Sequence, residues 1–215
     1  MESEINPNNI HAIITDVWSM VKIKIESGYP LSSEKSLVFL FSYCLIKYID
    51  PNVELVVDFE SQPYNDLQGK SKYLDLIIYT NEVYKVAIEF KLPKKSTNGS
   101  SNQTDTRLSL YRDVARLNYL VTKGINEIKI GIIIFACNES SYLNNKDLKK
   151  QATINYKTRE GYVFDSRILS SELIDEIPLP TLPINFNWDP TYFDEKNGYK
   201  QISGKFAYLN PIFIG

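Results

Sequence analysis

The chain has 215 residues, of which 43% are hydrophobic and 23% are charged, and its formal net charge is −2. This length and composition exclude a wholly disordered chain, and we expect residues 1–215 to form a single domain. The sequence has no apolar run of about eighteen residues, as a membrane span requires, and no signal peptide at its start. It therefore predicts a cytoplasmic protein that does not contact a membrane. The net charge gives no global attraction to nucleic acid, so a nucleic-acid function needs a local basic surface.

Histidine and cysteine are nearly absent. His11 is the only histidine, and Cys44 and Cys137, the two cysteines, lie in apolar runs. This argues against a disulfide framework and Cys-based zinc sites, and it excludes histidine zinc triads, Cys–His pairs, Ser–His–Asp triads and histidine-based nucleases. Catalysis, if present, must come from carboxylates, lysine, tyrosine, serine or a hard cation. We assign His11 to packing or the surface and both cysteines to the core.

In the first third of the chain, apolar residues are spaced as in amphipathic helices. Asn6, followed by Pro7, is expected to cap a first helix, in which apolar residues recur at helical spacing from Ile10 until Gly28. Ser32 or Ser33 is expected to cap a second helix, whose apolar run over 37–48 predicts burial on most sides. Glu34 lies in its first turn, where a carboxylate also complements the helix dipole.

The middle of the chain alternates strands and a helix. Runs of β-branched and apolar residues predict strands over 53–59, 73–79 and 83–92, and the last two form a hairpin. A helix is expected from residue 104 or 105 to the residue before Gly124. The run over 128–136 is apolar almost throughout, which predicts a strand covered on both faces. The order indicates a mixed α/β sandwich.

Three charged residues interrupt the hairpin. Ionised groups are costly in a sheet core unless they are paired, hydrogen-bonded or metal-bound. Glu89 and Lys91 are two apart, so they share one face of their strand. Asp75 joins that face if the pairing is centred on a three-residue loop over 81–83, whereas a two-residue loop places it on the other face. Two carboxylates beside an ammonium suit Mg²⁺-assisted hydrolysis of a phosphodiester, because the cation and the lysine offset charge on the phosphate.

The segments Leu74-Asp75 and Ile88-Glu89-Phe90-Lys91, with a capped helix before them and a helix and strand after them, resemble the PD-(D/E)xK nuclease superfamily. Leu74 stands where the family motif has proline. The resemblance implies a restriction-endonuclease-like αβββαβ core with a mixed central sheet flanked by helices. That core would cover about residues 32–137, with the N-terminal helix and residues 138–215 as additions.

The resemblance also implies a function. Asp75, Glu89 and Lys91 would be catalytic, and Asp75, Glu89 and Glu34 would hold Mg²⁺, for which Mn²⁺ can substitute. The protein would then be a Mg²⁺-dependent endonuclease that hydrolyses DNA, of restriction, defence or mobile-element type. Cutting both strands of a duplex predicts a homodimer, and RNA as a substrate stays open. Base contacts are expected from the aromatic, lysine-bearing region after residue 138, and backbone contacts from residues 94–106.

Several alternatives remain. The charged residues of the hairpin could form a Glu89–Lys91 or Asp75–Lys91 ion pair at a sheet edge without any function. The polar side of the third helix, with Arg112, Asp113 and Arg116, could contact phosphate, but an exposed helical face explains it equally. A second ExK triplet over 127–129 is rejected because no acid-bearing strand precedes it. The alternative function is a non-catalytic, nuclease-like module that binds protein or nucleic acid.

Overall fold

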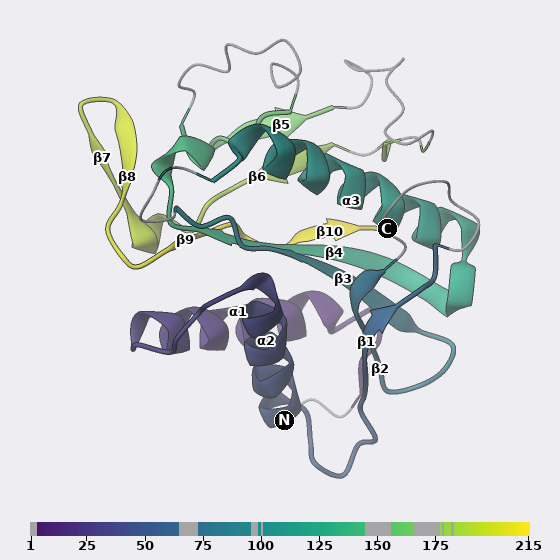
Figure 1. The fold of residues 1–215 in the computed structure, drawn as a ribbon. Coiled ribbons are helices and arrows are strands. Elements are labelled where there is room, and N and C mark those ends of the chain that lie inside the picture. Colours follow the sequence, from purple (N-terminus) through teal and green to yellow (C-terminus); the bar gives the residue numbers. More distant parts are fainter. Residues whose placement is uncertain are drawn as a thin grey trace.

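The computed structural model describes residues 4–64, 73–95, 99, 101–144, 156–165, 177, 179–181 and 183–215. The fold is a mixed α/β sandwich in which helices cover both faces of a central sheet (Figure 1). Helices α1 (Ile10–Glu26) and α2 (Glu34–Tyr48) pack together on one face, and α3 (Gln103–Lys123) covers the other. In the described part of the chain, no helix is long and apolar enough to cross a membrane.

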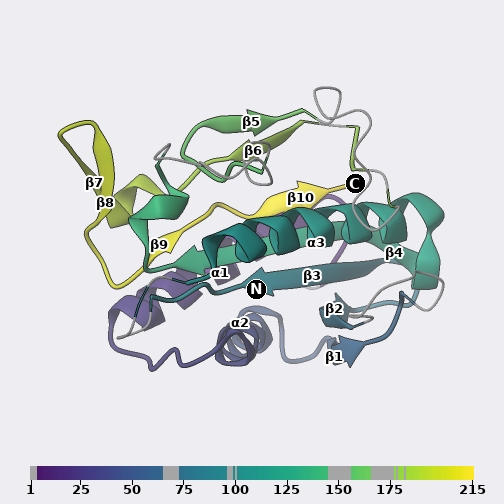
Figure 2. The ribbon, with the colours of Figure 1, turned by 45° about the horizontal axis from the view of Figure 1, so that its top comes forward.

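The central sheet has the order β1-β2-β3-β4-β10, with β9 paired to β4 beyond Ile133. Strands β3 and β4 are parallel because α3 carries the chain back across the sheet between them, and the other pairs are antiparallel (Figure 2). Two two-stranded ribbons, β5-β6 and β7-β8, lie outside this sheet. The strands are β1 (Val56–Ser61), β2 (Leu74–Tyr79), β3 (Lys85–Lys91), β4 (Ile128–Cys137), β5 (Tyr162–Phe164), β6 (Ile184–Phe186), β7 (Phe193–Lys196), β8 (Tyr199–Ile202), β9 (Ala207–Tyr208) and β10 (Ile212–Ile214).

The order of elements from α2 to β4 is the predicted helix, three strands, helix and strand. The sheet nevertheless extends past the predicted core, because β9 and β10 come from the segment expected to be an addition. Both strands pair with β4, whose apolar run needs neighbours on both edges and cover on both faces. The last part of the chain is therefore built into the sheet.

Two predicted helix starts are wrong. Helix α1 begins at Ile10, because residue 6 opens a separate hydrogen-bonded turn that leads into the helix. Helix α3 is capped by Asn102, whose side chain accepts a hydrogen bond from the Asp105 backbone N–H, so it starts earlier than expected. The α3 C-terminus is as predicted, since Gly124 adopts the left-handed conformation with φ of 63°.

The predicted burial of α2 holds for most of its apolar run, but one side of the helix is exposed. Its N-cap is Ser33, which forms a reciprocal capping box with Ser36. Phe39, Tyr43 and Ile46 are exposed along its outer side. The helix buries its other side against α1 and the sheet, so one stripe of its apolar run stays in solvent.

The sheet separates two apolar clusters. On the α1–α2 side, inward residues of β3 such as Ile88 and Phe90 pack with both helices, and Phe41 of α2 meets the Phe90 ring edge to face. On the α3 side, Ala87 and the other face of β4 pack with that helix and with residues after 156. Glu89 and Lys91 project to the α3 side, where they interrupt this second cluster.

Candidate functional site

The hairpin register brings Asp75 opposite Glu89. Leu76 pairs with Ile88, so one step further from the turn Asp75 faces Glu89. The pairing is centred on Glu82, which is the centre of the predicted three-residue loop. Strand β2 ends at Tyr79 and β3 begins at Lys85, so the connection between them is longer than predicted. The register that places Asp75 on the same face as Glu89 is confirmed.

The Asp75 side chain bridges β2 and β3 where their backbone pairing ends. Their regular pairing ends at Leu76, and the Phe90 backbone N–H donates instead to Asp75 Oδ2 at 2.8 Å. Protonated Glu89 also shares a side-chain hydrogen bond with Asp75, and Tyr64 Oη donates to Glu89 Oε1 at 3.3 Å. The two acids that the sequence predicts to converge therefore meet, and Glu89 lies nearly buried at 4% exposure.

Lys91 pairs with an acid of the third helix that the sequence did not predict as its partner. Its Nζ lies 2.5 Å from Asp113 Oδ2 on α3 and donates to the Phe90 carbonyl at 3.1 Å. Neither predicted lysine pair, with Glu89 or with Asp75, is the ion pair formed in the described residues. The geometric reason is that Lys91 reaches away from the sheet toward the helix that covers this face.

Helix α3 contributes buried charges to the site, so the exposed-face interpretation is wrong. Asp113 and Arg116 are each only 5% exposed. Asp113 lies three residues after Leu110 and four before Leu117, which places it on the stripe that faces the sheet. This spacing could have identified Asp113 as a site residue from the sequence, because an acid on a buried stripe needs a partner from the opposing strand.

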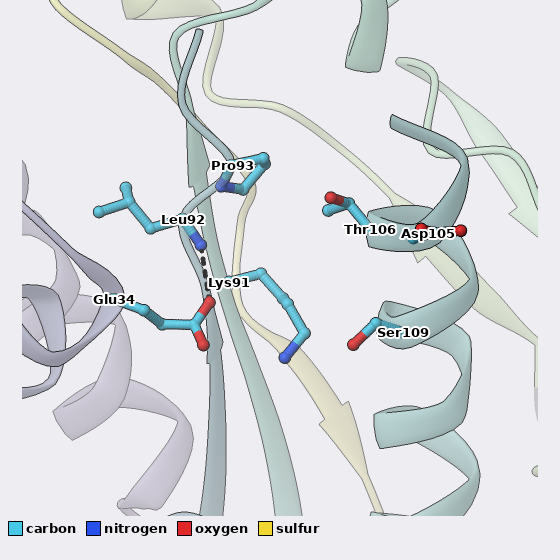
Figure 3. Close-up of a pocket in the computed structure, with 7 residues that line it drawn as sticks. All are labelled: Glu34, Lys91, Leu92, Pro93, Asp105, Thr106 and Ser109. Carbon is cyan, nitrogen blue, oxygen red and sulfur yellow. Dashed lines mark hydrogen bonds between the residues drawn. The ribbon is translucent and has the colours of Figure 1, made fainter. Parts of the chain in front are cut away.

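Glu34 reaches the same end of β3 from the other face of the sheet. The Ser33 cap starts α2 beside the end of β3, and the Leu92 backbone N–H donates to Glu34 Oε2 at 3.1 Å (Figure 3). Burial raises the pKa of Glu34, and the Lys91 ammonium opposes that rise. Glu34 is thus electrostatically coupled to the hairpin charges although it comes from a distant part of the sequence.

A polar pocket of about 350 Å³ opens at the edge of this cluster, where Glu34 and Lys91 line it. Figure 3 shows Lys91 extending into it from β3, with the Ser109 hydroxyl on the α3 side and the Glu34 carboxylate on the α2 side. Below we call it the polar pocket. Its lining residues are Glu34, Lys91, Leu92, Pro93, Asp105, Thr106 and Ser109.

Acids outnumber cations in the buried cluster around Lys91, and the directions of the pKa shifts reflect this excess. Burial raises the pKa of Glu89 well above its ordinary value, and the nearby Asp113 and Asp75 raise it further, while Lys91 lowers it. Burial also raises the pKa of Asp113, which Lys91 and Arg116 oppose. Burial lowers the pKa of Lys91, but Asp113, Glu34 and Glu89 more than offset this, so its pKa is raised and it stays charged. A further cation would lower the energy of the ionised cluster.

The donors suit a hard cation, with one limitation in number. Asp75 and Glu89 supply carboxylate oxygens in contact with one another, and Mg²⁺ is commonly held by one or two carboxylates together with water and substrate phosphate. In residues 4–64, 73–95 and the other described ranges, no group of three or more Asp, Glu, His or Cys residues is gathered to hold a metal. Glu34, the third expected ligand, is engaged with the Leu92 backbone instead. The residues therefore fit a two-carboxylate site.

The rejected ExK triplet is an ordinary surface pair. Glu127 and Lys129 are partly exposed, with 2.7 Å between their charged atoms, and they open β4 away from the polar pocket. Parts of both segments expected to contact nucleic acid are not among the residues that the structure describes. Residues 96–98 and 100, and the lysine-rich stretch over 145–155, lie outside the described residues.

A comparison with known protein families, with curated proteins and with solved structures finds no match for this chain.

Proposed function

We infer that the protein is a divalent-metal-dependent endonuclease that hydrolyses DNA phosphodiester bonds with the Asp75, Glu89 and Lys91 of its hairpin. The observation that carries this inference is the contact between Asp75 and Glu89, with Lys91 projecting from the same face of β3 into an open polar pocket. The order of elements around the site supports a restriction-endonuclease-like core of the PD-(D/E)xK type. A mixed sheet between helices is compatible with that core.

The surplus of acid supports a metal-dependent reaction. The charged groups coupled to Lys91 include four acids, Glu34, Asp75, Glu89 and Asp113, and this excess of negative charge over Lys91 and Arg116 repels a phosphate. Asp75 and Glu89 would hold Mg²⁺ or Mn²⁺, with Glu34 at the rim. When bound, the cation would offset phosphate charge and make a coordinated water more acidic. The carboxylates would then stay ionised despite their burial, because a cation replaces the missing hydration.

Lys91 would act through its charge. Its raised pKa makes proton abstraction at neutral pH unfavourable, whereas an ammonium fixed beside the pocket can stabilise the charge that builds on a phosphate. Asp113 would hold that ammonium in place, since its carboxylate lies 2.5 Å from Lys91 Nζ. Ser109 and Thr106 offer hydroxyls at the pocket wall for phosphate oxygens.

The experiment is cleavage of plasmid DNA and of RNA by the purified protein, with Mg²⁺ or with EDTA. We expect Mg²⁺-dependent DNA cleavage that falls by about 100-fold or more in Asp75→Asn and in Lys91→Ala. The matched control is Lys129→Ala, which removes the lysine of the exposed ExK triplet and should leave cleavage unchanged. Circular dichroism checks that each variant is folded. Cleavage that survives both Asp75→Asn and Lys91→Ala would show that the assignment is wrong.

Substrate and assembly are separate parts of the proposal. The same site could act on RNA, and the paired DNA and RNA substrates decide between them. Cleavage of both strands of a duplex by one site per chain would need two copies, so we expect a homodimer on duplex DNA. Sedimentation of the protein with an uncut duplex in Ca²⁺ measures that stoichiometry.

One observation favours a non-catalytic module instead. Lys91 already has Asp113 as a partner, and Asp75 and Glu34 each accept a backbone N–H, so the network is stable without a ligand. A module of this kind would bind protein or nucleic acid and show no cleavage. Titration with Mn²⁺ discriminates, because a nuclease site binds the metal through Asp75 and Glu89 while a purely structural network does not.

A further inference from the structure

A second pocket lies between α2 and β1 and reaches Asp75. Its volume is about 330 Å³, at the small end of the range of ligand sites. Phe39 of α2 and Phe59 of β1 form its walls, and they are 60% and 48% exposed. We call it the aromatic pocket. It is lined by Lys35, Val38, Phe39, Phe59, Glu60 and Asp75.

The aromatic pocket and the polar pocket flank one cluster of acids. Asp75 lines the aromatic pocket, and its hydrogen-bond partner Glu89 stands two residues before Lys91, which lines the polar pocket. The first turn of α2 also spans the two, because Glu34 lines the polar pocket and Lys35 the aromatic one. A nucleic-acid strand with a phosphate at the acids would therefore place a neighbouring nucleoside at the aromatic pocket.

The chemistry of the aromatic pocket matches a nucleobase with its phosphate. Exposed phenylalanine rings offer flat apolar faces, on which any base can stack. Lys35 supplies a cation at the rim, where it pairs with Glu60 at 2.6 Å. Both partners of that pair are largely exposed, so the pair is screened by solvent, and Lys35 can exchange Glu60 for a backbone phosphate.

The backbone around the aromatic pocket departs from regular sheet. Glu60 has φ of 52°, a left-handed conformation that L residues rarely adopt. The pairing of β1 with β2 passes from Phe59 to Ser61 and omits Glu60, at the position that faces Asp75. Strain of this kind persists where the surroundings hold it and is frequent at functional sites. Here it removes one residue from the ladder directly beside the candidate acid.

We propose that the aromatic pocket binds a single nucleobase that is unpaired, either in a single strand or turned out of a duplex, beside the scissile phosphate. The position of that phosphate rests on the proposed function, whereas the base binding itself does not. In a duplex the faces of each base are covered by its neighbours, so only an unpaired or unstacked base can lie against Phe39 and Phe59.

The test measures binding of a fluorescein-labelled oligothymidylate by anisotropy, with Ca²⁺ in place of Mg²⁺. We expect Phe39→Ala and Phe59→Ala each to raise the Kd by about 5- to 100-fold, and Phe39→Trp to retain it, because stacking needs the aromatic face. The matched control is Tyr43→Ala, one turn along the same exposed side of α2 but outside the aromatic pocket. Its Kd should equal that of the wild type. The same sequence as a duplex should bind the wild type more weakly.

Four outcomes would overturn the proposal. They are an unchanged Kd in both phenylalanine variants, an equal loss in Tyr43→Ala, equal binding of duplex and single strand, and a dimer in sedimentation that Phe39→Ala dissociates. The last would show that the exposed side of α2 is an interface between copies. An oligonucleotide with one abasic position scanned along it gives a readout that needs no variant, since one position should then lose affinity.

The outcome is separable from that of the proposed function. If the protein cuts neither DNA nor RNA but its single-strand binding depends on Phe39 and Phe59, the proposed base binding is supported and the proposed nuclease function is wrong. If cleavage depends on Asp75 but Kd and KM are unchanged in both phenylalanine variants, the proposed nuclease function is supported and the proposed base binding is wrong.

Discussion

Replacing Lys91 by methionine removes the cation that balances a buried carboxylate. Lys91 Nζ and Asp113 Oδ2 are 2.5 Å apart, and the side chains are 13% and 8% exposed. Methionine keeps most of the apolar length of the lysine stem, so the substitution changes charge more than packing. Asp113 is left beside Glu89, another acid, in a site with little water.

The expected loss follows from the response of Asp113. In an effective dielectric constant of about 20 the lost attraction at this separation is about 6–7 kcal/mol. Asp113 limits the loss by taking up a proton, which costs about 4 kcal/mol at pH 7 for a carboxyl with an ordinary pKa of about 3.9. We therefore expect the free energy of unfolding to fall by about 3–4 kcal/mol at pH 7, within the range of about 3–5 kcal/mol for broken buried pairs.

The loss should also depend on pH. In the variant, the folded-state pKa of Asp113 lies above its unfolded-state value, so stability is lost as pH rises above about 4. At pH 5 the cost of keeping Asp113 protonated is only about 1–2 kcal/mol. The difference between variant and wild type should therefore shrink by about half or more between pH 7 and pH 5.

Urea denaturation in EDTA, followed by the fluorescence of the buried Trp18 and Trp188, measures these differences. Lys129→Met is the control, because it breaks an exposed pair and should leave the midpoint unchanged. The double variant Lys91→Met/Asp113→Asn should recover most of the loss at pH 7, since it removes both charges. A loss below about 1 kcal/mol, as for a surface pair, or a double variant as unstable as the single one, would refute the reasoning.

Three further predictions concern the acids and the packing beneath them. Glu89→Gln should stabilise the metal-free protein at pH 8. The folded-state pKa of Glu89 is raised, so the stability of the wild type falls as pH rises from about 4.5 through that pKa. Urea midpoints at pH 5 and pH 8 measure this, and a variant that is less stable than the wild type at pH 8 would contradict it. Mn²⁺ at 100 times its Kd should stabilise the wild type by about 2.7 kcal/mol, or raise its Tm by about 5–11 °C, and an equal rise in Asp75→Asn by differential scanning fluorimetry would remove the metal assignment. Gly131→Ala should destabilise by about 1–3 kcal/mol in urea denaturation, because the new Cβ would lie 2.7 Å from Leu117 Cβ where β4 packs on α3; an unchanged midpoint would show that the helix can shift.

Periodicity and local chemistry were sufficient for the order of the elements and for the charges of the hairpin. Glu89 and Lys91 share a face because side chains alternate along any strand, and the centre of the turn brings Asp75 to that face. The ends of the helices were harder to predict from the sequence. Asn102 takes the cap of α3 because its side chain meets the Asp105 N–H, and several polar residues nearby could have done the same.

Long-range pairing was decided only by the tertiary structure. The sequence places Lys91 beside Glu89, yet its ion pair is with Asp113, because a parallel crossover lays α3 over this face of β3. The same packing leaves Phe39 exposed on a helix whose composition predicts burial, and it sets Phe59 beside it from a separate strand. Composition and spacing determine which charges and rings the chain must accommodate. Their partners depend on which surfaces the fold brings within a few ångströms, and that is a property of the packed chain as a whole.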